Sequence, residues 1–431
     1  MSAGGNTLMG LHPVNLIVIY RLAPLYIPLP EKEKGMDEKN QGKNERRIIG
    51  LDMHPDIFTG AALIGNNAHE AKTQWVKHAI NTEHLERWVE HNIDPNDLIV
   101  LEASGNSFET VARIESVGRS AVVLESFQAS RIGKHYCSTD KESAVNLARI
   151  YLSGLAKIVW VPDDKTRCRR EVFHRYQQTV NDTKRGICRI KSWLREYGIS
   201  LKKFPSFKKE STLDYILQLR QWDHIQKQLF KEMFYFYLEA LERKKKYKSI
   251  MAIEVANDKN LFKLTRLLGI NIITAFALGA FIGDIKRFQS SKKLAAYFGL
   301  IPKVALSGNG GFIGHLAKNA GRKDVRPLLI QSAQSILNSQ NSHLFKWGHK
   351  LVFRKGRNLA VVAIARKLIV ACWYLLNGFV IGLEEIPQHL IVKIDKIASA
   401  IGSKNIKQWG YKTVKEFKEE KISLFLEKSF T

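Results

Sequence analysis

The amino-acid sequence predicts an α/β domain near the N-terminus, then a long helical region, then a mostly α-helical C-terminal domain. Three observations predict this order. Between residues 48 and 160, short apolar segments alternate with amphipathic ones, which is typical of strands and helices that share a core. From about Pro162 the chain is highly charged and poor in glycine, with apolar residues at helical spacing. After residue 257 it is again rich in apolar helical segments, with a glycine-rich interruption at 307–314.

A chain of 431 residues is too long for one ordinary hydrophobic core, so several domains are expected. We predict an N-terminal extension at 1–47, an α/β domain at 48–160, a helical coiled-coil region at 161–256, a mostly helical domain at 257–402 and a charged tail at 403–431. The extension is expected to be disordered, because its mixed-charge part EKEKGMDEKNQGKNERR has almost nothing to bury.

The elements of the α/β domain follow from apolar runs and from turn residues. The segment Ile48–Met53 is expected to be the first strand, with Phe58–Ile64 as its hairpin partner. Two further short strands are predicted at Leu98–Leu101 and Ala121–Leu124, and helices at Thr110–Val117 and Ser138–Leu155.

Two long charged stretches, 165–197 and 212–256, predict an antiparallel helical pair or coiled coil. The run RKKKYK at 243–248 is either a solvated helix face or a phosphate contact. The expected apolar seam of the second helix consists of Leu217, Trp222, Ile225, Leu229, Met233 and Tyr237.

The charge balance indicates a polyanionic partner. The chain has 67 Lys and Arg against 41 Asp and Glu, a formal net charge of +26. A surplus of this size favours nucleic acid, because basic side chains release the counterions that phosphates condense, although ribosomal, chromatin and membrane-surface proteins share it. The four cysteines form no CxxC pair, which argues against a zinc ribbon or a disulfide framework and fits a reducing cytoplasm.

Two apolar runs need comparison with membrane spans. Leu267–Gly283 and Leu368–Leu383 both fall short of the roughly 20 apolar residues that a spanning helix needs. We expect both to be buried core helices and expect no membrane partner. The N-terminal run Val14–Leu29 lacks a basic lead and is not interpreted as a signal peptide.

Two carboxylates stand at the ends of predicted strands. Asp52 lies in an otherwise apolar strand, where a carboxylate is costly unless it is paired or bound to metal. Its plain interpretation is a loop cap at a strand end, and its functional interpretation is the first metal ligand of an RNase H-like sheet. Glu102 directly follows the strand LIVL, and neighbouring strands lie about 5 Å apart, so the two carboxylates could hold Mg²⁺ between them.

The segment Thr139–Ala144 supplies a third carboxylate. Asp140 opens a helix, where it is either an N-cap or the residue that completes the cluster. Ser143 falls on the same helical face three residues later, whereas Glu142 points elsewhere.

In this order and spacing, GLDMH, LEASGNSFE and STDKESAVNLARIY resemble the RuvC-like (RNase H-like) N-terminal domain of the DEDD-type insertion-sequence transposases. These are the bridge-RNA-guided serine recombinases, which are related to the pilin-gene invertases. The family pattern is Asp, Glu and then two Asp three residues apart, and Asp52, Glu102 and Asp140 match its first three positions. Ser143 occupies the fourth position, where its hydroxyl is a poorer, neutral ligand for Mg²⁺.

The C-terminal half carries a second resemblance. The segment from TRLLGIN to SGNGG is similar to the family's transposase domain, which begins with a helix-hairpin-helix-like turn at Gly269. Such a turn either presents N–H groups to a phosphate or only joins two helices. Ser307 matches the family's catalytic serine, although Leu306 stands where the family often has a second serine. Without the resemblance, Ser307 would be interpreted as a turn residue.

Four basic residues follow the serine: Lys318, Arg322, Lys323 and Arg326. The family is also basic in this segment, and only a phosphate-binding character is carried over to these residues.

The resemblance implies a two-part active site. Asp52, Glu102 and Asp140 would bind Mg²⁺, and Ser307 would form a covalent phosphoserine link to DNA. It further implies element-end and target DNA as substrates, a guide RNA, a homo-oligomer (dimer or tetramer), and a place in the prokaryotic cytoplasm near the nucleoid.

Two other functions are compatible with the sequence. A RuvC-like metal-dependent nuclease would use the same carboxylates with water in place of Ser307. A degenerate copy that binds nucleic acid without efficient catalysis is the second alternative, and Ser143 is the residue that favours it.

Overall fold

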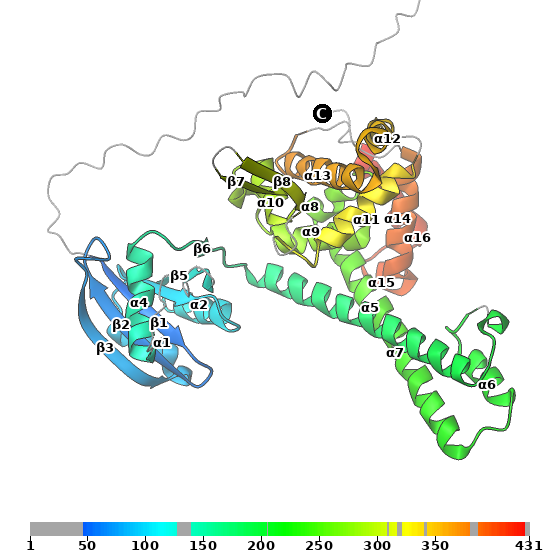
Figure 1. Cartoon of the computed structure of the whole chain (residues 1–431), viewed down its shortest axis with the longest axis horizontal. Coiled ribbons are helices and arrows are strands. Elements are labelled where there is room, and N and C mark those ends of the chain that lie inside the picture. Colours follow the sequence, from blue (N-terminus) through cyan, green and yellow to red (C-terminus); the bar gives the residue numbers. More distant parts are fainter. Residues whose placement is uncertain are drawn as a thin grey trace, which may run out of the picture. The chain divides into compact units, whose positions relative to one another are not determined.

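The computed structural model describes residues 46–126, 139–204, 206–307, 310–316, 321–339, 343–379 and 387–426. The chain divides into two compact units, Met1–Trp160 and Val161–Thr431, here called the N-terminal unit and the C-terminal unit (Figure 1). The predicted disorder of residues 1–47 falls outside the described residues, except for Arg46 and Arg47.

A six-stranded sheet with the order β3-β2-β1-β4-β5-β6 forms the centre of the N-terminal unit (Figure 1). Its first strand lies inside the sheet, antiparallel to β2 and parallel to β4. The predicted hairpin and α/β character are therefore confirmed. The strands are β1 Arg47–Met53, β2 Ile57–Ile64, β3 Lys72–Asn81, β4 Leu98–Glu102, β5 Ser120–Leu124 and β6 Ile158–Val159.

Helices cover both faces of this sheet. Helix α4 (Asp140–Leu152) packs on one face, where Ala144 and Ala148 join Ile48 and Val100 in a buried cluster. Helix α1 (Leu85–Asn92) packs on the other face, and its Trp88 makes an edge contact with Phe58. Helix α2 (Ser107–Ser116) follows β4. Because side chains alternate along a strand, even-numbered residues of β1 and β4 face α4.

Two long helices begin the C-terminal unit, as the sequence predicts. Helices α5 (Asp164–Glu196) and α7 (His224–Asn257) run antiparallel. At one end of the pair Arg169 binds Glu254, and at the other Trp193 stacks on Trp222 with ring centroids 4.5 Å apart. A short helix, α6 (Glu210–Gln218), lies between them in the sequence.

The predicted second long helix, 212–256, is interrupted at 219–223, so Leu217 lies in α6 and Trp222 precedes α7, and its predicted apolar seam is only partly correct. Trp222 and Tyr237 are buried, but Ile225 and Leu229 are 62% and 52% exposed. Phe230 and Phe234 occupy the seam instead, because they fall on the same helical face as Tyr237 and carry larger rings.

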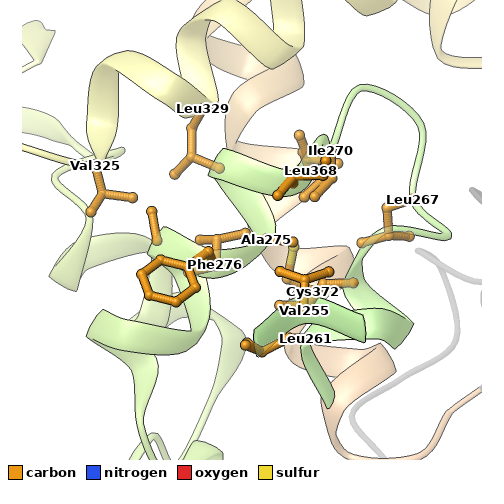
Figure 2. Packing of buried hydrophobic residues seen from close by; sticks show 14 of the residues in the cluster. Val255, Leu261, Leu267, Ile270, Ala275, Phe276, Val325, Leu329, Leu368 and Cys372 are labelled. Carbon is orange, nitrogen blue, oxygen red and sulfur yellow. The ribbon is translucent and has the colours of Figure 1, made fainter. Parts of the chain in front are cut away.

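The rest of the C-terminal unit packs around a core formed by residues far apart in the sequence (Figure 2). Leu267 and Ile270 project into this core with Phe276, Leu329 and Leu368. The helices are α8 Lys259–Leu264, α9 Ile272–Ile282, α10 Ser291–Tyr297, α11 Arg326–Leu337, α12 His343–Lys355, α13 Arg357–Leu376, α14 Pro387–Ile401, α15 Ser403–Gln408 and α16 Val414–Leu426.

The glycine-rich interruption contains a β-hairpin, which the sequence analysis did not predict. Strand β7 (Pro302–Ser307) pairs antiparallel with β8 (Gly310–Leu316). Alternation is weak here because small residues and glycines replace the usual strand formers.

Each apolar run contributes residues to a helix with a buried side, Ile272–Ile282 in the first and residues 368–376 in the second. Helix α9 is buried along most of its length, including Phe276, Leu278 and Phe281. Helix α13 is the one described helix that is long and apolar enough to cross a membrane, yet half of its most apolar window is buried within the protein. A core helix of a soluble protein passes the same test, so this helix is weak evidence for a membrane span.

The predicted charged tail contains two helices that contribute to the core. Phe417 of α16 is fully buried and packs against Trp409 and Tyr411, while Lys418 forms an ion pair with Asp395 of α14 at 2.7 Å. Helix α16 is therefore charged on its exposed side and packs into the core through Phe417.

Phe417→Ala should destabilise the C-terminal unit, since removing a fully buried phenylalanine side chain costs about 3–5 kcal/mol. Leu424→Ala is the matched control, because Leu424 lies in the same helix but is 41% exposed. Urea denaturation should give a lower midpoint for Phe417→Ala and a nearly unchanged one for Leu424→Ala. Equal midpoints for both variants would show that α16 does not stabilise the core.

Candidate functional site: a carboxylate cluster on the central strands

Asp52 is the next-to-last residue of β1, the strand at the centre of the sheet. It is on the face of the strand that α4 covers, in the same alternating row as Ile48 and Gly50. Its side chain is 21% exposed, so the carboxylate is held at the edge of the core.

Glu102 ends β4, the parallel neighbour of β1. The register pairs Gly50 with Val100 and Leu51 with Leu101, so Asp52 and Glu102 come next in line on the two strands. The structure thus places these two carboxylates on adjacent strand ends, as the sequence analysis expected.

Helix α4 brings Asp140 to the same end of these central strands as Asp52. The helix begins with a capping box in which Thr139 accepts a hydrogen bond from the Glu142 N–H and Glu142 accepts one from the Thr139 N–H. Asp140 is therefore the first helical residue and not the N-cap, which rules out its plain interpretation. Ser143 lies one turn further along and is partly buried.

Gly50 allows α4 to lie against the sheet at this point. A Cβ atom at position 50 would overlap the carbonyl oxygen of Ala144 and would lie 3.1 Å from the Ala148 nitrogen. Only a residue without a side chain fits there, and the close approach carries the start of α4 towards Asp52.

His54 joins the cluster and was not singled out from the sequence, although it stands in the GLDMH segment. Its Nε2 lies 3.8 Å from Asp52 Oδ2 and 3.7 Å from Asp140 Oδ1. One ligand atom from each of these three residues lies within 4.8 Å of the others. The signal that could have identified His54 was its position two residues after Asp52, just past the strand end, which puts it on the same side of the chain.

The electrostatics of the site disfavour charged carboxylates in the free protein. Burial raises the pKa of Asp52 above its usual value, the neighbouring His54 opposes this rise, and the charge of Asp140 adds to it. Burial also raises the pKa of Glu102, and the charge of Asp52 contributes. A bound cation would relieve both effects.

The donor set fits a divalent cation. Carboxylate oxygens are the ligands that Mg²⁺ and Mn²⁺ prefer, whereas an imidazole nitrogen suits transition metals such as Zn²⁺ and Fe²⁺. Asp52, His54 and Asp140 form a possible metal-binding group, and Glu102 stands on the strand next to Asp52.

Ser307 belongs to the C-terminal unit, where it is the last residue of β7 and pairs with Gly310 of β8. The turn residues that follow it, and the predicted phosphate ligand Lys318, lie outside the described residues. The structure therefore assigns Ser307 to the end of a hairpin rather than to an open loop.

The turn that contains Gly269 joins α8 to α9. Gly269 has a φ of +77°, and a Cβ atom there would lie 2.8 Å from the Ser332 carbonyl oxygen of α11. Lys393 of α14 donates to the carbonyl oxygens of Thr265 and Leu267 at 2.8 and 2.7 Å. The predicted turn is present, and it is fixed by the close contact with α11 and by the hydrogen bonds from α14.

The described members of the predicted basic cluster differ in their contacts: the two arginines contact protein groups, and the lysine is exposed. Arg322 binds both carboxylate oxygens of Asp324, at 2.6 and 3.2 Å, and its guanidinium lies 4.2 Å from the centre of the Phe281 ring. Arg326 contacts the Gly299 carbonyl oxygen at 3.4 Å, and Lys323 is exposed. Arg322 thus has a structural role, and phosphate binding by these residues stays a prediction.

Carboxylates gathered at the ends of central strands, in a chain of net charge +26, are typical of enzymes that process nucleic-acid phosphates. The profile described as "Transposase IS116/IS110/IS902 family" matches residues 263–346, which include Gly269, Ser307 and the basic cluster. Similarity to known proteins extends this match over more of the chain.

Three relatives illustrate the similarity. A transposase for the insertion sequence element IS1111A from Coxiella burnetii is 32% identical over 131 residues, 30% of this chain and 35% of that protein. A putative transposase from Sinorhizobium fredii is 25% identical over 54% of this chain and 56% of its own length. A probable family 20 transposase from Pseudomonas aeruginosa is 22% identical over 76% of this chain and 96% of its own length.

The alignments span about a third and about half of the first two relatives, and nearly all of the third. The chain is therefore similar to transposases of the IS116/IS110/IS902 family over residues 263–346 and, at lower identity, to a transposase over most of its length.

Gly50→Ala should loosen the contact between α4 and β1, because the added methyl overlaps the Ala144 carbonyl oxygen and overpacking costs about 1–3 kcal/mol. Hydrogen exchange of α4 amides should then accelerate by roughly one order of magnitude or more. Gly105→Ala is the control, since a Cβ there meets nothing within 4 Å. Unchanged α4 exchange in Gly50→Ala would show that the close contact does not position the helix.

Asp52→Asn should stabilise the protein at neutral pH without divalent metal. A carboxylate with a raised folded-state pKa contributes stability below its unfolded pKa, and this contribution is lost as pH rises through the folded pKa. The advantage of the variant in thermal unfolding should therefore shrink as pH falls towards 4.

Addition of Mg²⁺ should make the wild type more stable than Asp52→Asn, which reverses their order of stability without metal. At about ten times its dissociation constant, a cation bound only to the folded state adds about 1.4 kcal/mol of stability to the wild type. Asp52→Asn should gain little, whereas the control Asp56→Asn, an exposed residue outside the cluster, should gain as the wild type does. An equal gain in Asp52→Asn would place the metal elsewhere.

Proposed function

We propose that this protein is a DNA transposase that cuts and rejoins DNA through a serine nucleophile assisted by Mg²⁺. The observation that carries the proposal is the cluster of Asp52, His54 and Asp140 at the end of the central strands, with Glu102 on the strand next to Asp52. It occurs in a chain whose residues 263–346 match a transposase profile that spans Ser307.

The RNase H-like assignment of the N-terminal unit belongs to the same proposal. Its support is that the first strand lies inside the sheet and carries Asp52, with Glu102 on the parallel neighbour. An RNase H-like sheet needs this arrangement, since its first carboxylate comes from the central strand.

When bound, Mg²⁺ would polarise the scissile phosphate and offset the charge of the transition state. Asp52, Glu102 and Asp140 would hold it, and Ser143 would contribute a hydroxyl directly or through water. His54 would support the cluster from beside Asp52 and Asp140.

Ser307 would act on the phosphorus of the scissile phosphodiester. Its Oγ forms a bond to phosphorus, one P–O bond of the DNA strand breaks, and the hydroxyl proton ends on the leaving oxygen. The phosphoserine diester keeps the bond energy, so the reverse attack by another strand's hydroxyl releases the serine and joins DNA without ATP. The N-terminal cluster and Ser307 would serve this one reaction.

Guidance by an element-encoded RNA and action as a homo-oligomer complete the proposal. A protein that relies on base pairing for its sequence choice needs general contacts to phosphates more than base-reading contacts. The diffuse surplus of basic residues supports this division of labour. Element-end and target DNA would be the substrates.

Two other functions would use the same structure. A RuvC-like nuclease needs the carboxylates but not Ser307, so cleavage would survive its replacement. A weakened, nucleic-acid-binding copy is favoured by Ser143 in place of a carboxylate, and it would show no stabilisation of the wild type by Mg²⁺.

Ser307→Ala should abolish a covalent protein–DNA adduct, because the methyl group cannot attack phosphorus. The full chain would be incubated with labelled element-end DNA, RNA transcribed from the element, and Mg²⁺, and adducts would be resolved on denaturing gels. The control is Ser423→Ala, an exposed serine of α16, which should keep wild-type adduct levels. Cleavage by Ser307→Ala at the wild-type rate would favour the nuclease and contradict the serine mechanism.

A further inference from the structure

Two adjoining hollows flank the α8–α9 turn in the C-terminal unit. The smaller, of about 240 Å³, lies among α7, the turn and α14, and the larger, of about 430 Å³, lies among the turn, α11 and α14. They share Ile270 and Asn271 of the turn with Lys393 and Lys396 of α14.

Most of the lining surface of both hollows is apolar, and cationic and polar groups lie within it. Lys248 of α7 lines the smaller hollow, and His389 of α14 and hydroxyl groups of α11, including Ser335, line the larger. None of the described residues that line either hollow is acidic. The first turn of α9 also faces the hollows, and its partial positive charge adds to that of the lysines.

Three described carboxylates on or next to α7 and α14 are engaged with other cations. Asp395 of α14 forms an ion pair with Lys418 of α16. Glu254 and Asp258, at the end of α7, both bind Arg169 of α5 at 2.9 and 2.7 Å. These acids face other cations, whereas Lys248 and Lys396 are exposed at the hollows and Lys393 is held by the turn carbonyls.

The turn itself is rigid enough to serve as a platform. Lys393 fixes the carbonyl oxygens of Thr265 and Leu267, and Gly269 lies against the backbone of α11. Leu267 and Ile270 are fully buried (Figure 2). Ligand binding at the hollows would therefore require little reordering of the backbone.

We propose that the two hollows form one phosphodiester-binding groove for a DNA or RNA strand. Lys248 of α7 and Lys396 of α14 supply the charge, and the serines of α11 supply hydrogen bonds. This inference rests on the proposed action on nucleic acid but adds α7, α11 and α14 to the turn. The exposed, flexible cations Lys248 and Lys396 suit a repeating phosphate backbone better than a small enclosed anion.

The test compares two neighbouring substitutions on α11. Ser335 and Gln334 are both exposed, but only Ser335 lines the groove. Ser335→Glu should weaken binding of the full chain to a labelled random-sequence DNA duplex by about fivefold, since a carboxylate near a phosphate is repelled even in water. Gln334→Glu adds the same charge one residue away and should change the affinity by less than about twofold.

A second variant reports on the number of phosphate contacts. Lys396→Gln should reduce the slope of log affinity against log salt by about 0.9 for duplex DNA and about 0.7 for single-stranded RNA. Lys350→Gln, an exposed lysine of α12 outside the groove, should leave the slope unchanged. Fluorescence anisotropy in EDTA measures the affinities and their salt dependence for both nucleic acids. Thermal unfolding confirms that the variants are folded.

The DNA and RNA arms identify the ligand. If Ser335→Glu weakens binding more than Gln334→Glu does, for DNA alone or for RNA alone, the result supports the groove and identifies which nucleic acid it binds. Equal effects of Ser335→Glu and Gln334→Glu, with an unchanged salt slope in Lys396→Gln, would overturn it. Because no metal and no cleavage are involved, this failure is distinct from the absence of a Ser307 adduct, which would overturn the strand-exchange mechanism and leave the groove standing.

Discussion

The contact between Gly50 and the backbone of Ala144 determines the geometry of the carboxylate cluster. Without a side chain at position 50, α4 lies directly on the central strand. Asp140, the first residue of that helix, can then reach His54, whose ring also lies beside Asp52. Interiors are packed closely enough that a shift of one helix by the width of a methyl group moves every residue at its end. The capping box of Thr139 and Glu142 fixes the same end of the helix from the other side.

A comparable constraint operates in the C-terminal unit. Gly269 and Lys393 hold the turn before α9 against α11 and α14 through one close backbone contact and two hydrogen bonds. The same arrangement leaves lysines and serines around the hollows. In both units, a glycine lets two elements approach, and polar side chains collect at the edge of the contact. Such an arrangement suits a functional site, since rigid elements hold functional groups more precisely than loops do.

Much of the N-terminal site could be predicted from the sequence, because strand ends and helix starts are local features. Asp52, Glu102 and Asp140 stand next to apolar runs whose period and length indicate their structure. His54 was missed because a single histidine past a strand end carries no pattern of its own. Ile225 and Leu229 were misplaced because helical spacing defines a stripe but not which of two overlapping stripes meets the partner helix. The hairpin whose first strand ends at Ser307 was missed because its glycines obscure the alternation of a strand.

The sequence by itself determined the classes of element, the excess of positive charge and the order in which carboxylates and serine occur. These properties depend on residue type and on spacing along the chain. Tertiary structure alone decided that Asp140 belongs to the cluster and is not a helix cap, that Arg322 is bound by Asp324, and that Phe417 anchors the end of the chain in the core. The physical reason is that each depends on a partner distant in sequence or on the exact start of a helix, and only packing selects among the partners that a local pattern allows.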